Sequence, residues 1–184
     1  MIIEIADAHF DEVIELGNSV HGEGYLDHSS LSVIVEKGYK NGINSCFVAL
    51  ESDQLLGFRL TYAAEQWDID KWCTPNKWSV PTEHVGYFKC NTVAEDARGK
   101  GLGGLLLQSS VAALKRQGAR AGVSHLWKQS PNNSAVRYFT KAGGKLIKEH
   151  PNRWNDTSDH PDYICVICGS NCRCTASEML LTFN

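Results

Sequence analysis

A glycine-dense turn between an apolar strand and an apolar helix constrains the fold of this chain more than any other stretch. The turn runs from Val93 to Gly104, and the apolar run 105–107 follows at once. Glycine permits sharp bends and leaves amide N–H groups uncovered. At the start of a helix, such amides lie at the positive end of the helix dipole and favour a phosphate group. The stretch therefore predicts an anion-binding strand–turn–helix unit, with an ordinary turn as the alternative.

The spacing of this turn fits neither of two common nucleotide-binding loops. A P-loop requires Gly-Lys-Ser/Thr, but Lys100 is followed by Gly101 and Leu102. A dinucleotide fingerprint requires an acidic residue about twenty positions later. The sequence there is Arg-Ala-Gly-Val at 120–123 and holds no acid. Both alternatives are therefore excluded.

The pattern Arg98-x-x-Gly101-x-Gly103 instead resembles the acyl-CoA pyrophosphate loop of the GCN5-related N-acetyltransferases, the GNAT superfamily. Val93 and the leucines 105–107 stand where the motif of that family expects apolar residues. This first motif alone is short. A second motif at the expected distance makes the resemblance more specific.

The second motif follows an expected strand. Asn132, Ala135 and Gly143 match the spacing of the second GNAT motif. Phe139 stands in place of the tyrosine of the family, and Gly144 in place of its phenylalanine. Together the two motifs extend the resemblance over roughly residues 84–150.

The resemblance implies a single α/β (α+β) domain over residues 1–184 with a GNAT fold. Such a domain has a mixed central sheet of six to seven strands, flanked by about four helices. Hydrophobic periodicity and turn residues agree with that order of elements. We expect strands at 2–5, 46–50, 55–63, 84–93, 123–128, 145–149 and 178–183, and helices at 7–17, 31–38, 102–117 and 134–142.

By resemblance, acyl-CoA lies in a gap between the strands 84–93 and 123–128. The backbone near Val93 would pair with the pantetheine arm, and the amides of the glycine-rich turn would hold the pyrophosphate. Asn132 would reach the cofactor from the other side, or cap a helix beside Pro131. The expected cofactor-binding residues are Val93, Arg98, Gly99, Lys100, Gly101, Leu102, Gly103, Gly104, Asn132 and Phe139.

Acetyl transfer to an amine needs a proton acceptor, an oxyanion donor and a donor for the leaving thiolate. Phe139 occupies the position of the family's tyrosine acid and has no proton to give. Tyr138 is adjacent, but one residue turns a helix by about 100°, so we expect it to face elsewhere. His125 is the natural base near neutral pH, although a lone histidine is more often structural. Water-mediated deprotonation competes with it.

Lys89 is the remaining candidate for catalysis. Side chains alternate along a strand, so Tyr87, Lys89, Asn91 and Val93 are expected to share one face. Lys89 can act as a base only if burial lowers its pKa strongly. Binding an acidic group of the substrate, or plain solvation, is the alternative.

Four of the seven cysteines cluster near the C-terminus, at Cys165, Cys168, Cys172 and Cys174. The first pair has the spacing of a zinc knuckle. An odd cysteine total without a secretion signal does not indicate a disulfide framework. We expect one structural zinc within an insertion at 151–175, between the last two strands. Reduced, unliganded thiols are the alternative, and the compact context favours zinc over an iron–sulfur cluster.

In the GNAT family, this insertion and the loop after the first helix border the acceptor pocket. An aromatic pocket with acidic character would suit a cationic amine. The candidates for its walls are His21, Glu23, Tyr25, Trp67, Asp68, Asp70, Trp72, Trp78 and Trp154, although some of the tryptophans are expected in the core.

Composition narrows the partners. Lys and Arg total 18 and Asp and Glu total 21, so the net charge of −3 does not suggest nucleic-acid binding. No run of eighteen apolar residues predicts a membrane span, and the start of the chain resembles no signal peptide. We therefore expect a soluble, cytoplasmic protein, and a homodimer remains open.

These observations lead to one main hypothesis about function. The chain is expected to be an acetyl-CoA-dependent N-acetyltransferase that acts on a primary amine by direct transfer in a ternary complex. A small molecule is favoured as acceptor because the aromatic loops suggest an enclosed pocket. The alternative is an acyl-CoA-binding sensor or zinc-stabilised interaction domain without turnover. A zinc hydrolase is disfavoured, because all-cysteine sites are usually closed.

Overall fold

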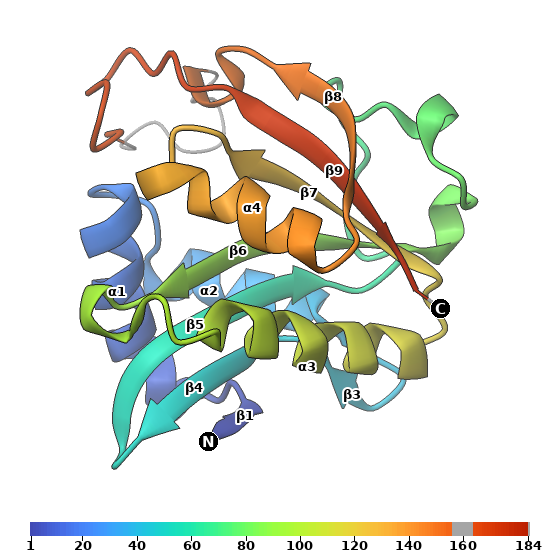
Figure 1. Ribbon diagram of the computed structural model, residues 1–184. Coiled ribbons are helices and arrows are strands. Elements are labelled where there is room, and N and C mark those ends of the chain that lie inside the picture. The colour runs from blue at the N-terminus through green and yellow to red at the C-terminus, as the bar shows by residue number, and fades with distance from the viewer. Residues whose placement is uncertain (156–163, 184) are drawn as a thin grey trace.

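A mixed seven-stranded sheet with helices on both faces dominates the computed structural model, which describes residues 1–155 and 164–183 (Figure 1). The strands follow the order β1-β4-β5-β6-β7-β9-β8 across the sheet. A two-stranded hairpin of β2 and β3 lies beside it. The strands are β1 (Ile2–Glu4), β2 (Tyr39–Lys40), β3 (Ile43–Asn44), β4 (Phe47–Glu51), β5 (Gln54–Tyr62), β6 (Val85–Val93), β7 (Ala121–Trp127), β8 (Lys145–His150) and β9 (Ala176–Thr182).

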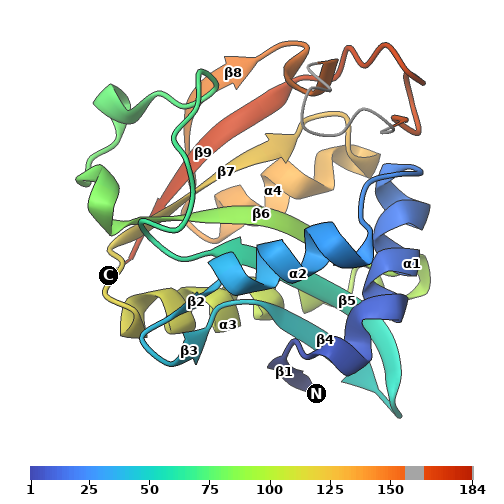
Figure 2. The ribbon, with the colours of Figure 1, turned by 180° about the vertical axis from the view of Figure 1, so that it is seen from behind.

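The four α-helices of the described chain divide between the two faces. α3 (Leu102–Arg116) and α4 (Ser134–Lys141) lie in front of the sheet in Figure 1. α1 (Phe10–His21) and α2 (His28–Lys37) cover the other face (Figure 2). Each pair buries its own apolar cluster against the strands. The predicted fold class and order of elements are confirmed, and the hairpin of β2 and β3 is an addition. No helix among the described residues combines the length and apolarity needed to cross a bilayer.

Helix α2 begins three residues earlier than its apolar spacing predicted. Asp27 accepts a hydrogen bond from the amide of Ser30 at 2.7 Å, and the Ser30 hydroxyl lies 3.0 Å from the amide of Asp27. This reciprocal capping box satisfies amides that a helix terminus otherwise leaves unpaired. The helix therefore starts at His28, ahead of its first buried residue, Leu31.

Strands β6 and β7 are the only parallel neighbours in the described sheet, and they separate along their length. Pairing runs from Val85 with Ala121 to Tyr87 with Val123 and then stops. β6 nevertheless continues to Val93, and β7 continues to Trp127. Figure 1 shows the two arrowheads diverging. The predicted gap between these strands is therefore present.

A β-bulge in β6 overturns the prediction that Tyr87, Lys89, Asn91 and Val93 share one face. Leu60 of β5 pairs with Cys90, but the next residue, Thr61, pairs with Phe88, so the register skips Lys89. An extra residue of this kind reverses the alternation of side chains on either side of it.

The contacts of the two halves of β6 confirm this reversal. Tyr87 stacks on Tyr62, which packs with the apolar cluster under α1 and α2. Asn91 lies on the opposite face, where its amide nitrogen approaches Gly103 of α3. Tyr87 and Cys90 therefore face the α1–α2 side together, and Asn91 and Val93 face α3.

Candidate functional site

The glycine-rich turn presents a row of backbone amides at the start of α3. Gly99 and Gly101 have φ values of +79° and +81°, in the left-handed region that favours glycine. The amides from Gly99 to Gly103 donate no hydrogen bond to another described residue, whereas Gly104 and Leu105 bond back to the carbonyl of Gly101. A Cβ atom at Gly99 or Gly101 would meet only open space. This geometry suits a phosphate group.

A cavity of about 1620 Å³ connects this turn with the gap between β6 and β7 and continues to the α1–α2 loop. Its charged lining is almost entirely cationic, with Glu95 the only carboxylate among the described residues. Such a lining suits a polyanionic ligand. The cationic side chains are Arg59, Lys89, Arg98, Lys115, Arg137, Lys141 and Arg153.

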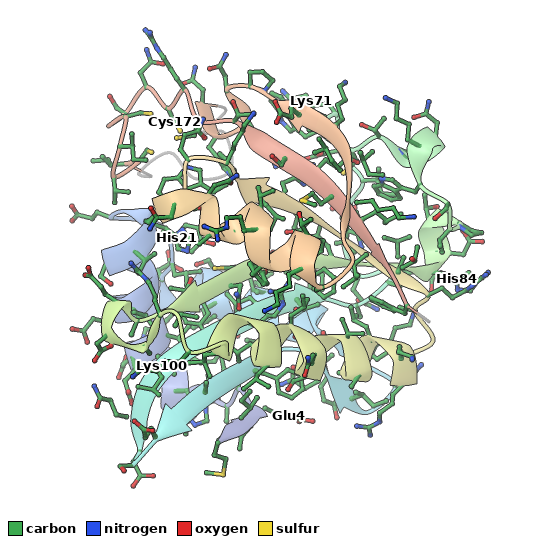
Figure 3. The ribbon with its side chains drawn as sticks, in the orientation of Figure 1. Glu4, His21, Lys71, His84, Lys100 and Cys172 are labelled. Carbon is green, nitrogen blue, oxygen red and sulfur yellow. The ribbon has the colours of Figure 1, made fainter. Side chains whose placement is uncertain are left out.

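Most of the predicted cofactor-binding residues line this cavity, and two do not. Lys100 lies at the loop before α3 (Figure 3) but is not part of the lining. Phe139 is fully buried and packs edge-on against Phe88, with ring centroids 5.7 Å apart. The geometry therefore gives Phe139 a role in the core. The lining includes Val93, Arg98, Gly99, Gly101, Leu102, Gly103, Gly104 and Asn132.

Two further cofactor predictions acquire structural detail. The carbonyl of Val93 accepts a hydrogen bond from Nε of Arg98 at 3.1 Å, so that carbonyl is already engaged. The side chain of Ser130, and not that of Asn132, accepts from the first turn of α4, through the amide of Ala135 at 3.1 Å. The alternative role of Asn132 as a helix cap is therefore wrong.

Arg59 is a cavity residue that the sequence did not single out. Its side chain is 1% exposed, and its guanidinium lies 4.5 Å above the ring of Phe88. Nη1 donates to the hydroxyl of Tyr138 at 2.8 Å, whereas Nε has no partner among the described residues. Tyr138 also lines the cavity, so the helix turns it towards the site while Phe139 faces the core. A lone arginine within an apolar strand was the only sequence signal.

His125 lines the cavity, but both of its ring nitrogens are occupied. Nε2 lies 2.6 Å from the carbonyl of Trp72, which can only accept, so Nε2 carries the proton. Nδ1 therefore accepts from the hydroxyl of Tyr87 at 3.0 Å. Burial lowers the pKa of His125, partly offset by the bond to Trp72, and burial raises the pKa of Tyr87. The catalytic assignment of His125 remains a prediction, and this geometry does not favour direct proton transfer to the ring.

A second buried histidine and a glutamate lie behind His125. Glu178 is 0% exposed and accepts four hydrogen bonds, two from Thr74, one from Nε1 of Trp78 and one from Nε2 of His150. These bonds hold the pKa of Glu178 below its ordinary value, although burial alone would raise it. One ligand atom each of His125, His150 and Glu178 lie within 4.8 Å of one another. Hydrogen bonds already occupy both ring nitrogens of His125, Nε2 of His150 and both carboxylate oxygens of Glu178, so the cluster is built as a polar support.

The four clustered cysteines converge as their spacing predicted. Sγ of Cys174 lies 3.9 Å from that of Cys165 and 3.7 Å from that of Cys168, and one ligand atom from each of the four lies within 4.8 Å of the others. Gly169, with φ of +72°, closes the turn through paired backbone bonds to Cys165. Part of the predicted insertion, residues 156–163, lies outside the described residues.

These sulfur distances fit a tetrahedral metal site. Zinc–sulfur bonds of about 2.3 Å place tetrahedral sulfurs about 3.8 Å apart. Burial raises the pKa of Cys172 to about 11 and that of Cys174 further, so in isolation these two thiols stay protonated. A divalent cation would supply the missing positive charge.

Only part of the residue set predicted for the acceptor pocket lines the cavity, and the pocket itself stays a prediction. His21, Tyr25 and Trp154 line the cavity, and the cluster residue Cys172 lies at the same end of the molecule as His21 (Figure 3). Trp67 and Trp78 instead pack with Val85 in a separate core cluster. Among the expected acids, Glu23, Asp68 and Asp70 do not line the cavity. Asp70 instead accepts from the backbone of Trp72 and pairs with Arg153 at 3.3 Å.

Solved structures share this architecture at low sequence identity. A Salmonella typhimurium protein, yncA, described as a putative acetyltransferase with its cofactor acetyl-CoA, covers 100% of this chain and 94% of its own (17% identity, TM-score 0.68). The Escherichia coli ribosomal-protein-S18-alanine N-acetyltransferase covers 99% of this chain and 92% of its own, at 13% identity and a TM-score of 0.68. Arabidopsis thaliana Naa50 in complex with the bisubstrate analogue CoA-Ac-MVNAL covers 100% of this chain and 98% of its own, at 16% identity and a TM-score of 0.66.

The sequence comparisons give a family but no near relative. No curated protein matches the sequence. The model of the acetyltransferase (GNAT) family matches residues 10–144, which is well over half of the chain. The fold, the open amides before α3 and the gap between β6 and β7 all agree with that match. The chain belongs to the acetyltransferase (GNAT) family.

Proposed function

We propose that this acetyltransferase uses acetyl-CoA to acetylate a primary amine of a small molecule, by direct attack within a ternary complex. One observation carries the proposal. A single cavity joins the open amides before α3 to the gap beside the β6 bulge and then to the α1–α2 loop. A cofactor and an acceptor entering from opposite ends would meet beside the bulge.

The cofactor end supports acetyl-CoA as the acyl donor. The amides of Gly99 to Gly103 would hold the pyrophosphate, and the surrounding cations would neutralise its charge. The backbone pairing of β6 with β7 stops at Tyr87, and beyond Phe88, whose carbonyl accepts from the Ser124 hydroxyl at 2.8 Å, the edge of β6 is available to pair with the pantetheine arm.

The acceptor end supports a small molecule. The amide of Ile164, beside the cysteine cluster, donates to the carbonyl of Glu23 in the α1–α2 loop at 3.2 Å. This bond ties the segment before the cysteine cluster to the α1–α2 loop, next to the cavity-lining residues Tyr25 and Cys165. A peptide would need an open groove at this end, whereas a small amine needs only a pocket.

The direct test is thiol release from acetyl-CoA against polyamines, aminoglycosides, amino acids, arylalkylamines and N-terminal peptides. Turnover with a small amine, and not with peptides, is the expected result. A preference for peptides would overturn the acceptor class. Confirmed CoA binding without turnover on any amine would favour a non-catalytic acyl-CoA sensor.

The cofactor assignment has its own test in Gly101→Val, with Gly118→Val as the matched control. Both glycines have positive φ and open space around a Cβ atom, so the backbone strain is comparable. Only Gly101 lies beside the proposed pyrophosphate. We expect at least a tenfold loss of CoA affinity at Gly101 alone, measured by calorimetry, because the side chain occupies the phosphate position. Equal affinities would overturn the assignment.

We also propose that Cys165, Cys168, Cys172 and Cys174 hold one structural zinc ion, a role that the sulfur distances support. Elemental analysis of protein purified without chelator should find close to one zinc per chain. Cys168→Ser should lower this content, whereas Cys73→Ser, a half-buried thiol outside the cluster, should not. Metal-free wild-type protein would refute the site.

A further inference from the structure

Cys90 has a polar environment that differs from that of the other buried thiols. Its Sγ lies 3.1 Å from the hydroxyl of Thr92 and 3.6 Å from Nε2 of His21. The same Nε2 lies 2.8 Å from the Thr92 hydroxyl. Tyr25 also hydrogen-bonds to the sulfur. Side chains from the end of α1, from the loop after it and from β6 therefore surround one sulfur atom.

The geometry connects His21 and Cys90 both directly and through Thr92. A proton on Nε2 of His21 can be donated to the Thr92 oxygen, whose own hydroxyl can donate to the sulfur. Burial alone raises the pKa of the Cys90 thiol. The charge and hydrogen bond of His21, with the bonds from Thr92 and Tyr25, outweigh that effect and lower the pKa to about 7.

Cys46 shows what burial does without such partners. It lies on the same face, in the same apolar cluster as Cys90, and is fully buried. Among the described residues, its sulfur hydrogen-bonds only with the backbone of Thr61, and burial raises its pKa to about 12. The two thiols therefore differ in their polar neighbours and not in their depth.

The position of Cys90 adds a second reason to assign it a role. It directly follows the bulge residue Lys89, and it faces the α1–α2 side of the gap between β6 and β7. Cys90, His21 and Tyr25 all line the cavity. Tyr62 is a further titratable group near the sulfur, and Phe58 and Leu60 belong to the same apolar cluster as Cys90.

We propose that the Cys90–His21 pair is the proton acceptor for the amine of the acceptor substrate. This inference rests on the proposed transferase function and names a base for it. The Cys90 thiolate, which the charge of His21 stabilises, takes the proton and becomes a thiol. Thr92 and Tyr25 position the pair.

The proton balance of the reaction closes without any further reactant. The Cys90 thiolate takes one proton from the ammonium form of the acceptor and releases the free amine. The nitrogen lone pair then attacks the thioester carbonyl carbon, and the carbon–sulfur bond breaks as the tetrahedral intermediate collapses. The leaving CoA thiolate takes the second proton from that nitrogen. Cys90 returns its own proton to solvent after product release.

The first experiment tests the thiolate and its place without relying on turnover. Iodoacetamide should alkylate Cys90 with an apparent pKa near 7, as followed by peptide mass mapping, and should barely modify Cys46 in the same sample. Acetyl-CoA should protect Cys90 because its acyl end would cover the sulfur. His21→Asn should slow the alkylation at pH 7 severalfold. Alkylation of Cys90 only at high pH, or without protection by acetyl-CoA, would contradict the proposal.

The second experiment tests the proton transfer itself. With a strongly basic amine, Cys90→Ser should lower kcat/KM about 100-fold, the lower end of the effect expected for general acid–base catalysis. With an acceptor whose amine is uncharged at the assay pH, the same variant should approach the wild-type rate. The control is Cys73→Ser, which removes a thiol outside the cavity. Equal losses with both acceptors would show that Cys90 is only structural.

Three further outcomes separate this inference from the proposed function. Wild-type turnover with unimpaired Cys90→Ser would overturn only the inference. No turnover by the wild type on any amine would remove the function and the need for a base together. Exchange of labelled CoA into acetyl-CoA without an acceptor would show an acetyl-cysteine intermediate instead of a base.

Discussion

Two polar clusters lie on the same face of β6, on either side of the bulge at Lys89, and they are built differently. In the first, Tyr87 bonds to His125, and the buried pair of His150 and Glu178 lies behind them. Both ring nitrogens of His125, Nε2 of His150 and both carboxylate oxygens of Glu178 have hydrogen-bond partners. In the second, Cys90 and His21 converge on a cavity wall.

The difference shows how similar residue types acquire different roles. A buried polar network with all of its hydrogen bonds satisfied stabilises one arrangement and resists a change of charge. Catalysis needs a group that can gain or lose a proton at the pH of the reaction. We therefore assign the cluster of Tyr87, His125, His150 and Glu178 to support, and the Cys90–His21 pair to proton transfer.

The largest expected effect tests the supporting role of the first cluster. Glu178→Gln replaces an oxygen that accepts hydrogen bonds with an amide group that can only donate them. If the amide group replaces Oε1, the Thr74 amide and Nε1 of Trp78 lose their acceptor. If it replaces Oε2, the Thr74 hydroxyl and Nε2 of His150 lose theirs. We expect the free energy of unfolding to fall by about 3 kcal/mol, measured by urea denaturation.

The matched control is Glu149→Gln on the neighbouring strand β8. Glu149 pairs with Lys128 at 2.6 Å, and both side chains are more than 40% exposed. Because solvent screens such pairs, we expect a loss of less than about 0.5 kcal/mol. Similar losses for both variants would remove the distinction between a saturated buried cluster and the surface.

The ionisation of Glu178 should make the free energy of unfolding depend on pH in the acidic range. The folded state lowers the pKa of Glu178, so its contribution to stability is complete above the ordinary glutamate range. The contribution is lost as the pH falls through the lowered value. Urea midpoints of the wild type should therefore fall towards those of Glu178→Gln below about pH 4. A constant gap between the two proteins down to pH 2 would contradict this explanation.

A smaller effect is expected from Tyr87→Phe, which removes the hydroxyl that His125 accepts from. The unpaired Nδ1 should lower the free energy of unfolding by about 1–2 kcal/mol. The value of kcat/KM should fall less than tenfold, because the proposed base lies elsewhere. A 100-fold loss in steady-state assays, with the fold intact, would reverse the roles of the two clusters.

The smallest effect is expected on the opposite face of the sheet. Tyr138→Phe removes the hydroxyl that accepts from Arg59, so stability should fall by about 1 kcal/mol. The turnover rate should barely change, and Tyr39→Phe on the exposed hairpin provides a control for both readouts. A large loss of rate for Tyr138→Phe would assign its hydroxyl to the chemistry, for example as the donor to the CoA thiolate.

Much of the fold could be predicted because its signals are local. The glycine turn before α3, the glycine turn after α4 and the apolar runs each specify a short element without distant partners. The cysteine cluster was likewise predictable from local spacing. One turn closed by Gly169 brings Cys165 and Cys168 together, and the four thiols converge. The face of α4 that points to the cavity was harder to predict. Phe139 was expected at the cofactor and lies in the core, whereas Tyr138 was expected to face elsewhere and lines the cavity.

The sequence by itself determined the family, the order of elements and the place of the glycine-rich turn before α3, because these depend on backbone freedom and hydrophobic periodicity. Only the tertiary structure decided the faces and pairings of the site. The bulge at Lys89 places Tyr87 and Cys90 on one face, and no residue pattern along the strand encodes that reversal. His21 meets Cys90 across 69 positions of sequence. Such a pair forms only when a helix end and a strand pack together, so its chemistry is a property of the folded chain.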